Sequence, residues 1–117
     1  MVEMTVTVPD RLAARLQPMR AWLPAVLELS LAGFRTPAAH TVSEVIDFLS
    51  AGPTPEQVGA FMVSGRAQER LERLLALNKV GLLSHEEQDE LDELEQLEHI
   101  MVMLKAQAYQ RVLEMDK

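Results

Sequence analysis

The chain of 117 residues is 48% hydrophobic and carries 18 acidic against 11 basic residues, for a formal net charge of −7. This is the length of one domain, and so apolar a chain is not disordered. The lack of cysteine excludes disulfides and thiolate metal sites and fits the reducing cytoplasm, where we expect the protein to reside. No apolar run nears the roughly 20 residues of a membrane span, and no signal peptide is visible, so no membrane partner is expected.

The first expected element is a short β-strand over residues 4–8. Apolar and polar side chains alternate there, with Met4, Val6 and Val8 on one face and Thr5 and Thr7 on the other. One short strand followed only by helices cannot form a sheet, so it needs a second strand, and an identical chain is the obvious donor. The pattern therefore predicts a homodimer joined by an N-terminal β-ribbon.

Two short helices are expected next. Asp10 opens the first, and Pro18 either kinks it or opens a new turn. The second begins near Pro24, ends at Gly33 and is apolar almost all round, which is typical of a buried or dimer-interface helix. We assign three of its residues to the dimer interface: Val26, Leu27 and Leu31. Residues 1–36 form the predicted strand-helix-helix dimerisation module and residues 37–117 the helical partner-binding region, within one compact unit overall.

Three capping boxes mark the starts of later helices. In this motif a Ser or Thr hydroxyl accepts a backbone hydrogen bond, and a Glu or Gln three residues on reaches back to the first residue. The pairs are Thr41 with Glu44, Thr54 with Gln57, and Ser84 with Glu87. A further helix is expected over about 66–78, before an exit at Gly81.

The helix that follows Ser84 is the longest, and it extends to about Met115, or roughly 45 Å. Its apolar residues recur at spacings of three and four, which is close to a heptad seam. One small core cannot cover such a helix, so part of it is expected to pair with the preceding helix and part to meet a partner. The predicted fold is mainly α, with a short N-terminal β-strand, several short helices and a C-terminal helical hairpin built on one long helix.

Motifs of catalysis are missing from the sequence. It contains no glycine-rich phosphate loop, no nucleophile elbow and no zinc-protease histidine pair. His85 with Asp89 and Glu95 with His99 each place two ligand-type groups one turn apart, but such pairs are ordinarily solvated surface pairs on an acidic helix. We therefore expect no enzyme activity, no cofactor and no metal.

The long helix begins with a strongly acidic run. Residues 86–98 hold eight acids and no base. The plainer interpretation is a solvated face, favoured by the helix dipole only in the first turn. The sharper one is a docking face for a basic protein such as a nuclease toxin. The residues assigned to partner binding are Glu90, Leu94, Leu97, Met101, Leu104 and Ala108.

The N-terminus is also a candidate for contact with nucleic acid. Ribbon-helix-helix proteins read bases with the outward face of their strand, which here offers Thr5 and Thr7, and Arg11 and Arg15 follow on the first helix. Thr is a weaker base reader than Arg, Lys, Asn or Gln, and Glu3 repels phosphate. Dimerisation without DNA reading is therefore the favoured alternative.

Two segments carry a family resemblance. Thr5-Val-Thr-Val-Pro-Asp-Arg-Leu12 with Leu23-Pro-Ala-Val-Leu-Glu-Leu29 resembles the N-terminal part of ribbon-helix-helix antitoxins. Residues 70–105, with Leu77-Asn-Lys-Val-Gly-Leu-Leu-Ser-His-Glu-Glu87 and Leu97-Glu-His-Ile100, are similar to small uncharacterised antitoxin-like proteins of cyanobacteria and related bacteria. The resemblance implies a non-enzymatic regulator of a toxin-antitoxin system that dimerises through its N-terminus and binds a partner through its acidic C-terminal helix. The alternative is a helical adaptor or assembly subunit with no nucleic-acid role.

Overall fold

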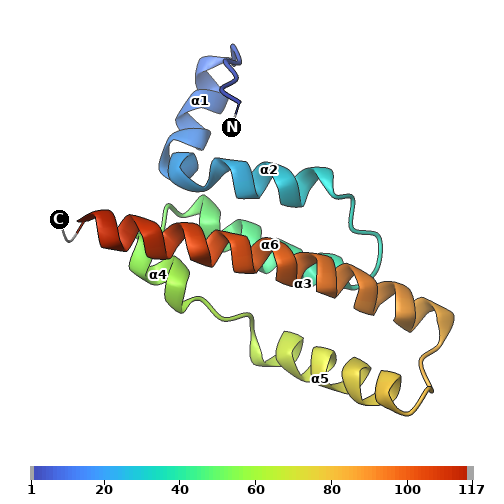
Figure 1. Cartoon of the computed structure of the whole chain (residues 1–117). Helices are drawn as coiled ribbons and strands as arrows, with labels where there is room; N and C mark the ends of the chain where they lie inside the picture. The colour runs from blue at the N-terminus through green and yellow to red at the C-terminus, as the bar shows by residue number, and fades with distance from the viewer. Residues whose placement is uncertain (1, 116–117) are drawn as a thin grey trace.

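The computed structural model describes residues 2–115, and within them the ordered elements are all helical (Figure 1). The long helix α6 runs the length of the molecule, with the others arranged around it, and α1 points away from the body. In chain order the elements are α1 (Asp10–Leu16), a 3₁₀-helix η1 (Gln17–Trp22), α2 (Leu23–Leu31), α3 (Ala38–Ser50), α4 (Pro55–Ala60), α5 (Gly65–Lys79) and α6 (His85–Met115).

The predicted N-terminal strand is wrong, and with it the β-ribbon. Residues 2–9 form neither strand nor helix, and no strand occurs elsewhere among the described residues. A strand needs a neighbouring strand to bond its backbone, and every other ordered segment of this chain is helical. Apolar and polar side chains do alternate along residues 4–8, but the apolar ones are not packed against anything that would fix a strand: Met4 is 84% exposed and Val6 70% exposed.

Most of the expected helix signals act where the sequence places them. Asp10 begins α1, and Pro18 and Pro24 stand in the first turns of η1 and α2. Both bonds of the capping box form at Thr54, at 2.9 and 3.2 Å, and at Ser84, at 3.0 and 3.1 Å. These boxes fix the starts of α4 and α6.

The capping box expected at Thr41 is wrong, because α3 begins three residues earlier at Ala38. There the Thr36 hydroxyl accepts a hydrogen bond from the Ala38 N–H at 3.1 Å. Glu44, the other half of the expected box, instead accepts from the Ser64 N–H at 3.3 Å. The residue types are those of a cap, but α3 begins before Thr41, and Glu44 contacts the distant Ser64 instead.

The core is built on one side of α6. Its seam packs against α2, α3, α4 and α5, so the predicted long helix and its contact with the preceding helix are confirmed. The stretch of seam that was expected to meet a partner is covered by the chain's own helices. The buried apolar residues of α6 are Leu91, Leu94, Leu97, Ile100, Met101, Leu104 and Ala108.

Trp22 joins three distant parts of the chain. Its indole Nε1 donates to the Pro53 carbonyl at 2.9 Å, and the Arg111 guanidinium lies 5.2 Å from its ring centroid, a cation–π distance. The ring is buried. It therefore ties η1 to the α3–α4 connection and to the last turns of α6.

No helix in the described part of the chain is both long enough and apolar enough to cross a membrane.

The turn at Gly52 yields a stability prediction. Gly52 has φ +73°, and a Cβ placed there overlaps the Pro18 carbonyl, whereas Gly81 has φ +72° with open space around it. Gly81→Ala should therefore cost only the left-handed backbone strain, about 1 kcal/mol, and Gly52→Ala about 3 kcal/mol, because overlap is added. Urea unfolding of the two variants measures the difference. Equal losses would show that the Pro18 contact does not constrain the fold.

Candidate functional site

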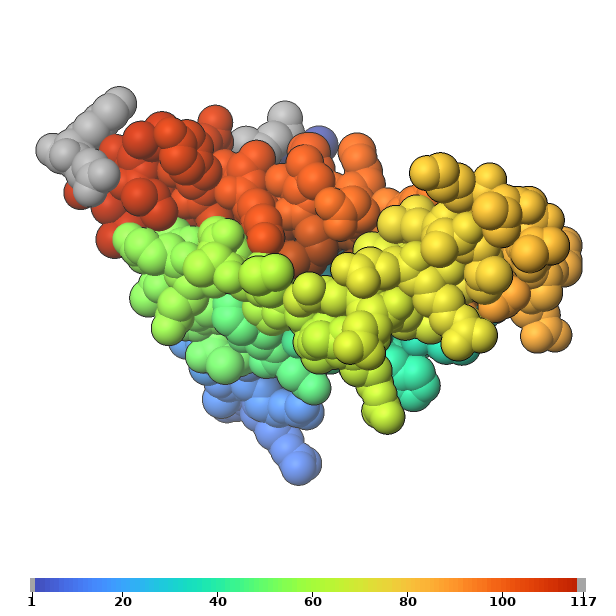
Figure 2. Space-filling view, turned by 90° about the horizontal axis from the view of Figure 1, so that it is seen from below, coloured from blue at the N-terminus to red at the C-terminus, as the bar shows by residue number. Residues whose placement is uncertain are grey.

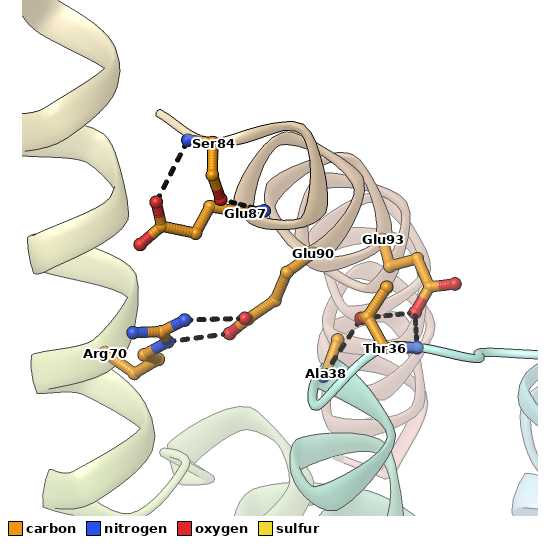
Figure 3. A network of polar contacts seen from close by, with 7 residues as sticks. All are labelled: Thr36, Ala38, Arg70, Ser84, Glu87, Glu90 and Glu93. Atoms are coloured by element: carbon orange, nitrogen blue, oxygen red, sulfur yellow. Dashed lines mark hydrogen bonds and ion pairs between the residues drawn. The ribbon is translucent and has the colours of Figure 1, made fainter. Parts of the chain in front are cut away.

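The acidic run of α6 divides into two sets that point in different directions. Glu87, Glu90 and Glu93, three residues apart, all accept hydrogen bonds from the chain itself (Figure 3). Glu90 and Glu93 turn toward the body of the protein, and Glu87 accepts from Ser84 at the start of α6. The remaining acids of the run lie on the exposed side of the helix. The inward set therefore has a structural role, and only the outward set is open to a partner.

Glu90 forms a two-bond ion pair with Arg70 of α5. The Arg70 Nε and Nη2 donate to the two carboxylate oxygens at 2.9 and 2.8 Å. Glu90 is only 3% exposed, and its hydrogen bond to the guanidinium raises the pKa of Arg70. Because a buried carboxylate is costly without a partner, this pair fixes where α5 lies against α6.

Glu93 caps the loop that leads into α3. Its carboxylate accepts from the backbone N–H of Arg35 at 2.9 Å and of Thr36 at 3.0 Å, and from the Thr36 hydroxyl at 2.7 Å. Burial acts against the charged form, but these hydrogen bonds outweigh it and lower the pKa of Glu93. Hydrogen bonds with Ser84 likewise lower the pKa of Glu87.

A groove of about 810 Å³ opens between α3, α5 and α6. Arg66 and Arg70 stand on the α5 side, His40 and Glu44 on the α3 side, and Leu94 at the α6 side. Both carboxylates that line it, Glu44 and Glu90, already have donors from within the chain. The groove's acids are therefore committed to holding α5 in place.

The outer face of α6 is acidic in its first half. Its exposed acids are Glu86, Asp89, Asp92, Glu95 and Glu98. Asp89 lies 3.9 Å from His85, and Asp92 accepts from Gln88 at 2.9 Å. Among residues 2–115 none of the five pairs with a lysine or arginine. We call these five residues the acidic row.

The outer face becomes apolar in its second half. Val102, Ala106, Tyr109 and Leu113 recur at spacings of four, three and four, and all are exposed, Val102 by 56% and Tyr109 by 65%. We call these four residues the outer stripe. In Figure 2, α6 (orange to red) forms the upper edge of the molecule, with α4 and α5 (green to yellow) below it. A helix that is apolar on two sides normally has a neighbour on each.

The structure places the residues predicted for partner binding in the core. All six are buried and face the chain's own helices, so they form one cluster but offer no surface to a partner in this conformation. They are Glu90, Leu94, Leu97, Met101, Leu104 and Ala108.

The residues predicted for dimerisation do not form one surface, and those predicted for nucleic-acid contact lie on the N-terminal segment. Val26 belongs to the core, while Leu27 and Leu31 on the same helix are exposed, Leu31 by 83%. Met4 and Val6 are exposed and Val8 is half-buried. The four candidates for nucleic-acid contact are all exposed: Thr5, Thr7, Arg11 and Arg15.

Sequence reasoning overlooked the outer stripe and the capping role of Glu93. The stripe has the same spacing of three and four as the inward seam, so a search for a second seam on the same helix would have found it. Nothing local marks Glu93, because its donors lie more than fifty residues away in the chain.

Comparisons with family models, with curated proteins and with solved structures gave no match to this chain. Within the described residues, no three histidine, aspartate or glutamate side chains converge on a position that would hold a metal ion. The site is therefore argued from its own geometry.

The Glu93 cap predicts a pH-dependent contribution to stability. Because folding lowers its pKa, the carboxylate stabilises the fold above the ordinary value of 4.5 and loses that effect as the pH falls through the lower folded-state value. Glu93→Gln should cost about 1 kcal/mol at pH 7, a figure reduced for partial exposure, and less at pH 3. Urea unfolding at both pH values measures this. Glu72→Gln, an exposed control on α5, should change nothing, and equal effects of both variants would contradict the cap.

The Arg70–Glu90 pair predicts non-additive substitutions. Arg70→Met leaves a buried carboxylate unpaired and should cost about 2 kcal/mol, less than for a fully buried pair because Arg70 is partly exposed. Adding Glu90→Leu removes the stranded charge and should restore the stability to within about 1 kcal/mol of the original. A double-mutant cycle by urea unfolding tests this. Simple additivity of the two changes would show that the residues do not interact.

Proposed function

We propose that this chain is a non-enzymatic, antitoxin-like regulator of the cytoplasm that binds a second protein through the outer face of α6. One observation carries the proposal: the acidic row runs directly into the outer stripe, and no part of the described chain covers either. The resemblance of residues 77–87 and 97–100 to antitoxin-like proteins supports the regulatory class.

The partner's chemistry follows from this face. Five carboxylates that pair with no lysine or arginine among the described residues attract a basic surface and speed its approach. The exposed Val102, Tyr109 and Leu113 then supply apolar contact area, with tyrosine a residue enriched in protein interfaces. A protein with a cationic groove beside an apolar patch, such as a nuclease, matches both halves. The mechanism is occlusion, in which α6 lies across the groove that the partner uses for its own substrate.

DNA reading has little support in this arrangement. Without a strand, Thr5 and Thr7 have no rigid element to present them to a groove, and rigid placement is what base readout needs. A helical adaptor or assembly subunit with no nucleic-acid role is therefore the second candidate function. It is favoured by the exposed apolar residues at the N-terminus, which suit permanent contact with another subunit.

Site-specific photocrosslinking in cells tests the proposed surface. Benzoylphenylalanine at position 102 or 109 should give an adduct with a different protein, because both side chains lie on the outer stripe. The matched control is position 72 on α5, where Glu72 is equally exposed but lies off the stripe. Adducts at all three positions, or only with a second copy of the chain, would contradict an external partner at this face. Inhibition of the captured partner's activity supports the antitoxin-like form over the adaptor.

A further inference from the structure

The N-terminal arm, which we define as residues 2–16, buries little within its own chain, where only Val8 and Leu16 are half-buried. Its apolar side chains Val2, Met4, Val6 and Leu12 are exposed, and α1 buries no residue at all. A helix of this length is far below the roughly 12–15 residues at which an isolated helix becomes stable in water. The arm therefore needs a surface from outside the chain.

The arm is the chemical complement of the outer face of α6. Arg11 and Arg15 lie one turn apart on α1, with Leu12 and Leu16 one turn apart beside them. This gives α1 a basic ridge next to an apolar ridge. On α6, the acidic row is followed by the outer stripe, which supplies the opposite charge and a matching apolar track.

The two surfaces do not meet within one chain. Helix α1 stands on the α2 side of the molecule and projects away from α6, and the segment before it runs back beside α1 (Figure 1). On α6, the side facing the η1–α2 region is marked by Arg111, whose guanidinium donates to the Ala21 carbonyl. At 3.6 residues per turn, Tyr109 of the outer stripe lies about 160° around the helix from Arg111. A second chain has no such restriction.

We propose that the N-terminal arm of a second copy of this chain covers the outer face of α6. Arg11 and Arg15 pair with Glu95 and Glu98, and the apolar residues of the arm lie on the outer stripe. Reciprocal exchange of two arms closes the assembly as a two-fold dimer. The inference rests on the proposed function, because it concerns the same outer face of α6. The arm of the second copy covers this face until the external partner binds, so the arm and the external partner compete for it.

A second α6 is a poorer occupant of this face. Packing two outer faces in parallel sets one acidic row against the other, and like charges across an interface are strongly unfavourable. Antiparallel packing instead lays each acidic row over the partner's apolar stripe and leaves carboxylates without cations. Of the two occupants compared, the arm is the one that carries the opposite charge.

Charge reversal on each side gives a sharp test by sedimentation velocity of the full chain. Arg11→Glu with Arg15→Glu turns the arm acidic, and Glu95→Lys with Glu98→Lys turns the α6 face basic. Each double variant alone should dimerise at least about tenfold more weakly than the wild type, because arm and face then repel. An equimolar mixture of the two should dimerise again, since both contacts of the mixed pair join opposite charges.

Controls keep the result independent of folding and of the external partner. All four substituted residues are exposed, so each variant should keep one cooperative urea unfolding transition, and its circular dichroism should lose no more than the helical signal of α1, which depends on the second chain. Glu69→Lys with Glu72→Lys, on exposed α5 positions, should leave the dimer intact. A dimer that survives the α6 reversal, a mixture that stays monomeric, or a wild type that is monomeric throughout would each overturn arm exchange. Failure of the external partner shows separately, as an absence of foreign photocrosslinks.

Discussion

Burial of the inward seam of α6 is the contact on which the rest of the structure depends. Helices α2, α3, α4 and α5 all pack on this one helix, and the largest buried side chains beyond it meet around its seam. With so few aromatic residues, the core relies on Leu, Val, Ala and Met, whose burial contributes through area alone. One side of this helix thus organises the domain, and its opposite side contacts no other helix among the described residues.

The acidic run illustrates how one stretch of sequence serves two purposes. Glu87, Glu90 and Glu93 recur every three residues and so stay on the inward side, where they cap α6, anchor α5 and cap the approach to α3. These inward acids are neutralised by donors that the fold supplies. The exposed acids of the run pair with no lysine or arginine among the described residues, and their mutual repulsion is a cost that solvent, salt or a cationic partner relieves.

The sequence predicts the helices well where the signals are local. Proline positions and two of three capping boxes place helix starts, and spacing alone predicts both the length of α6 and its seam. The wrong predictions are those that depend on which segment a residue contacts. The alternation over residues 4–8 is compatible with a strand but does not show that a second strand is present to pair with it. The heptad seam indicates that one side of α6 is covered but does not indicate which chain covers it. The box at Thr41 failed because α3 begins earlier, beside Thr36, and because Glu44 is used by the distant Ser64.

The uneven distribution of charge between the two parts of the chain connects these observations. Residues 1–36 carry a net charge of +1, from four arginines against three acids, and residues 37–117 carry −8, from seven bases against fifteen acids. If the two regions neutralised each other within one chain, Arg11 and Arg15 would lie against α6, yet both are fully open to solvent on a helix that points away from it. We propose that this separation of charge, with apolar residues exposed beside each region, serves contact between molecules. On the two proposals made above, an external cationic partner and the arm of a second copy compete for one face, and concentration and salt set the balance between them.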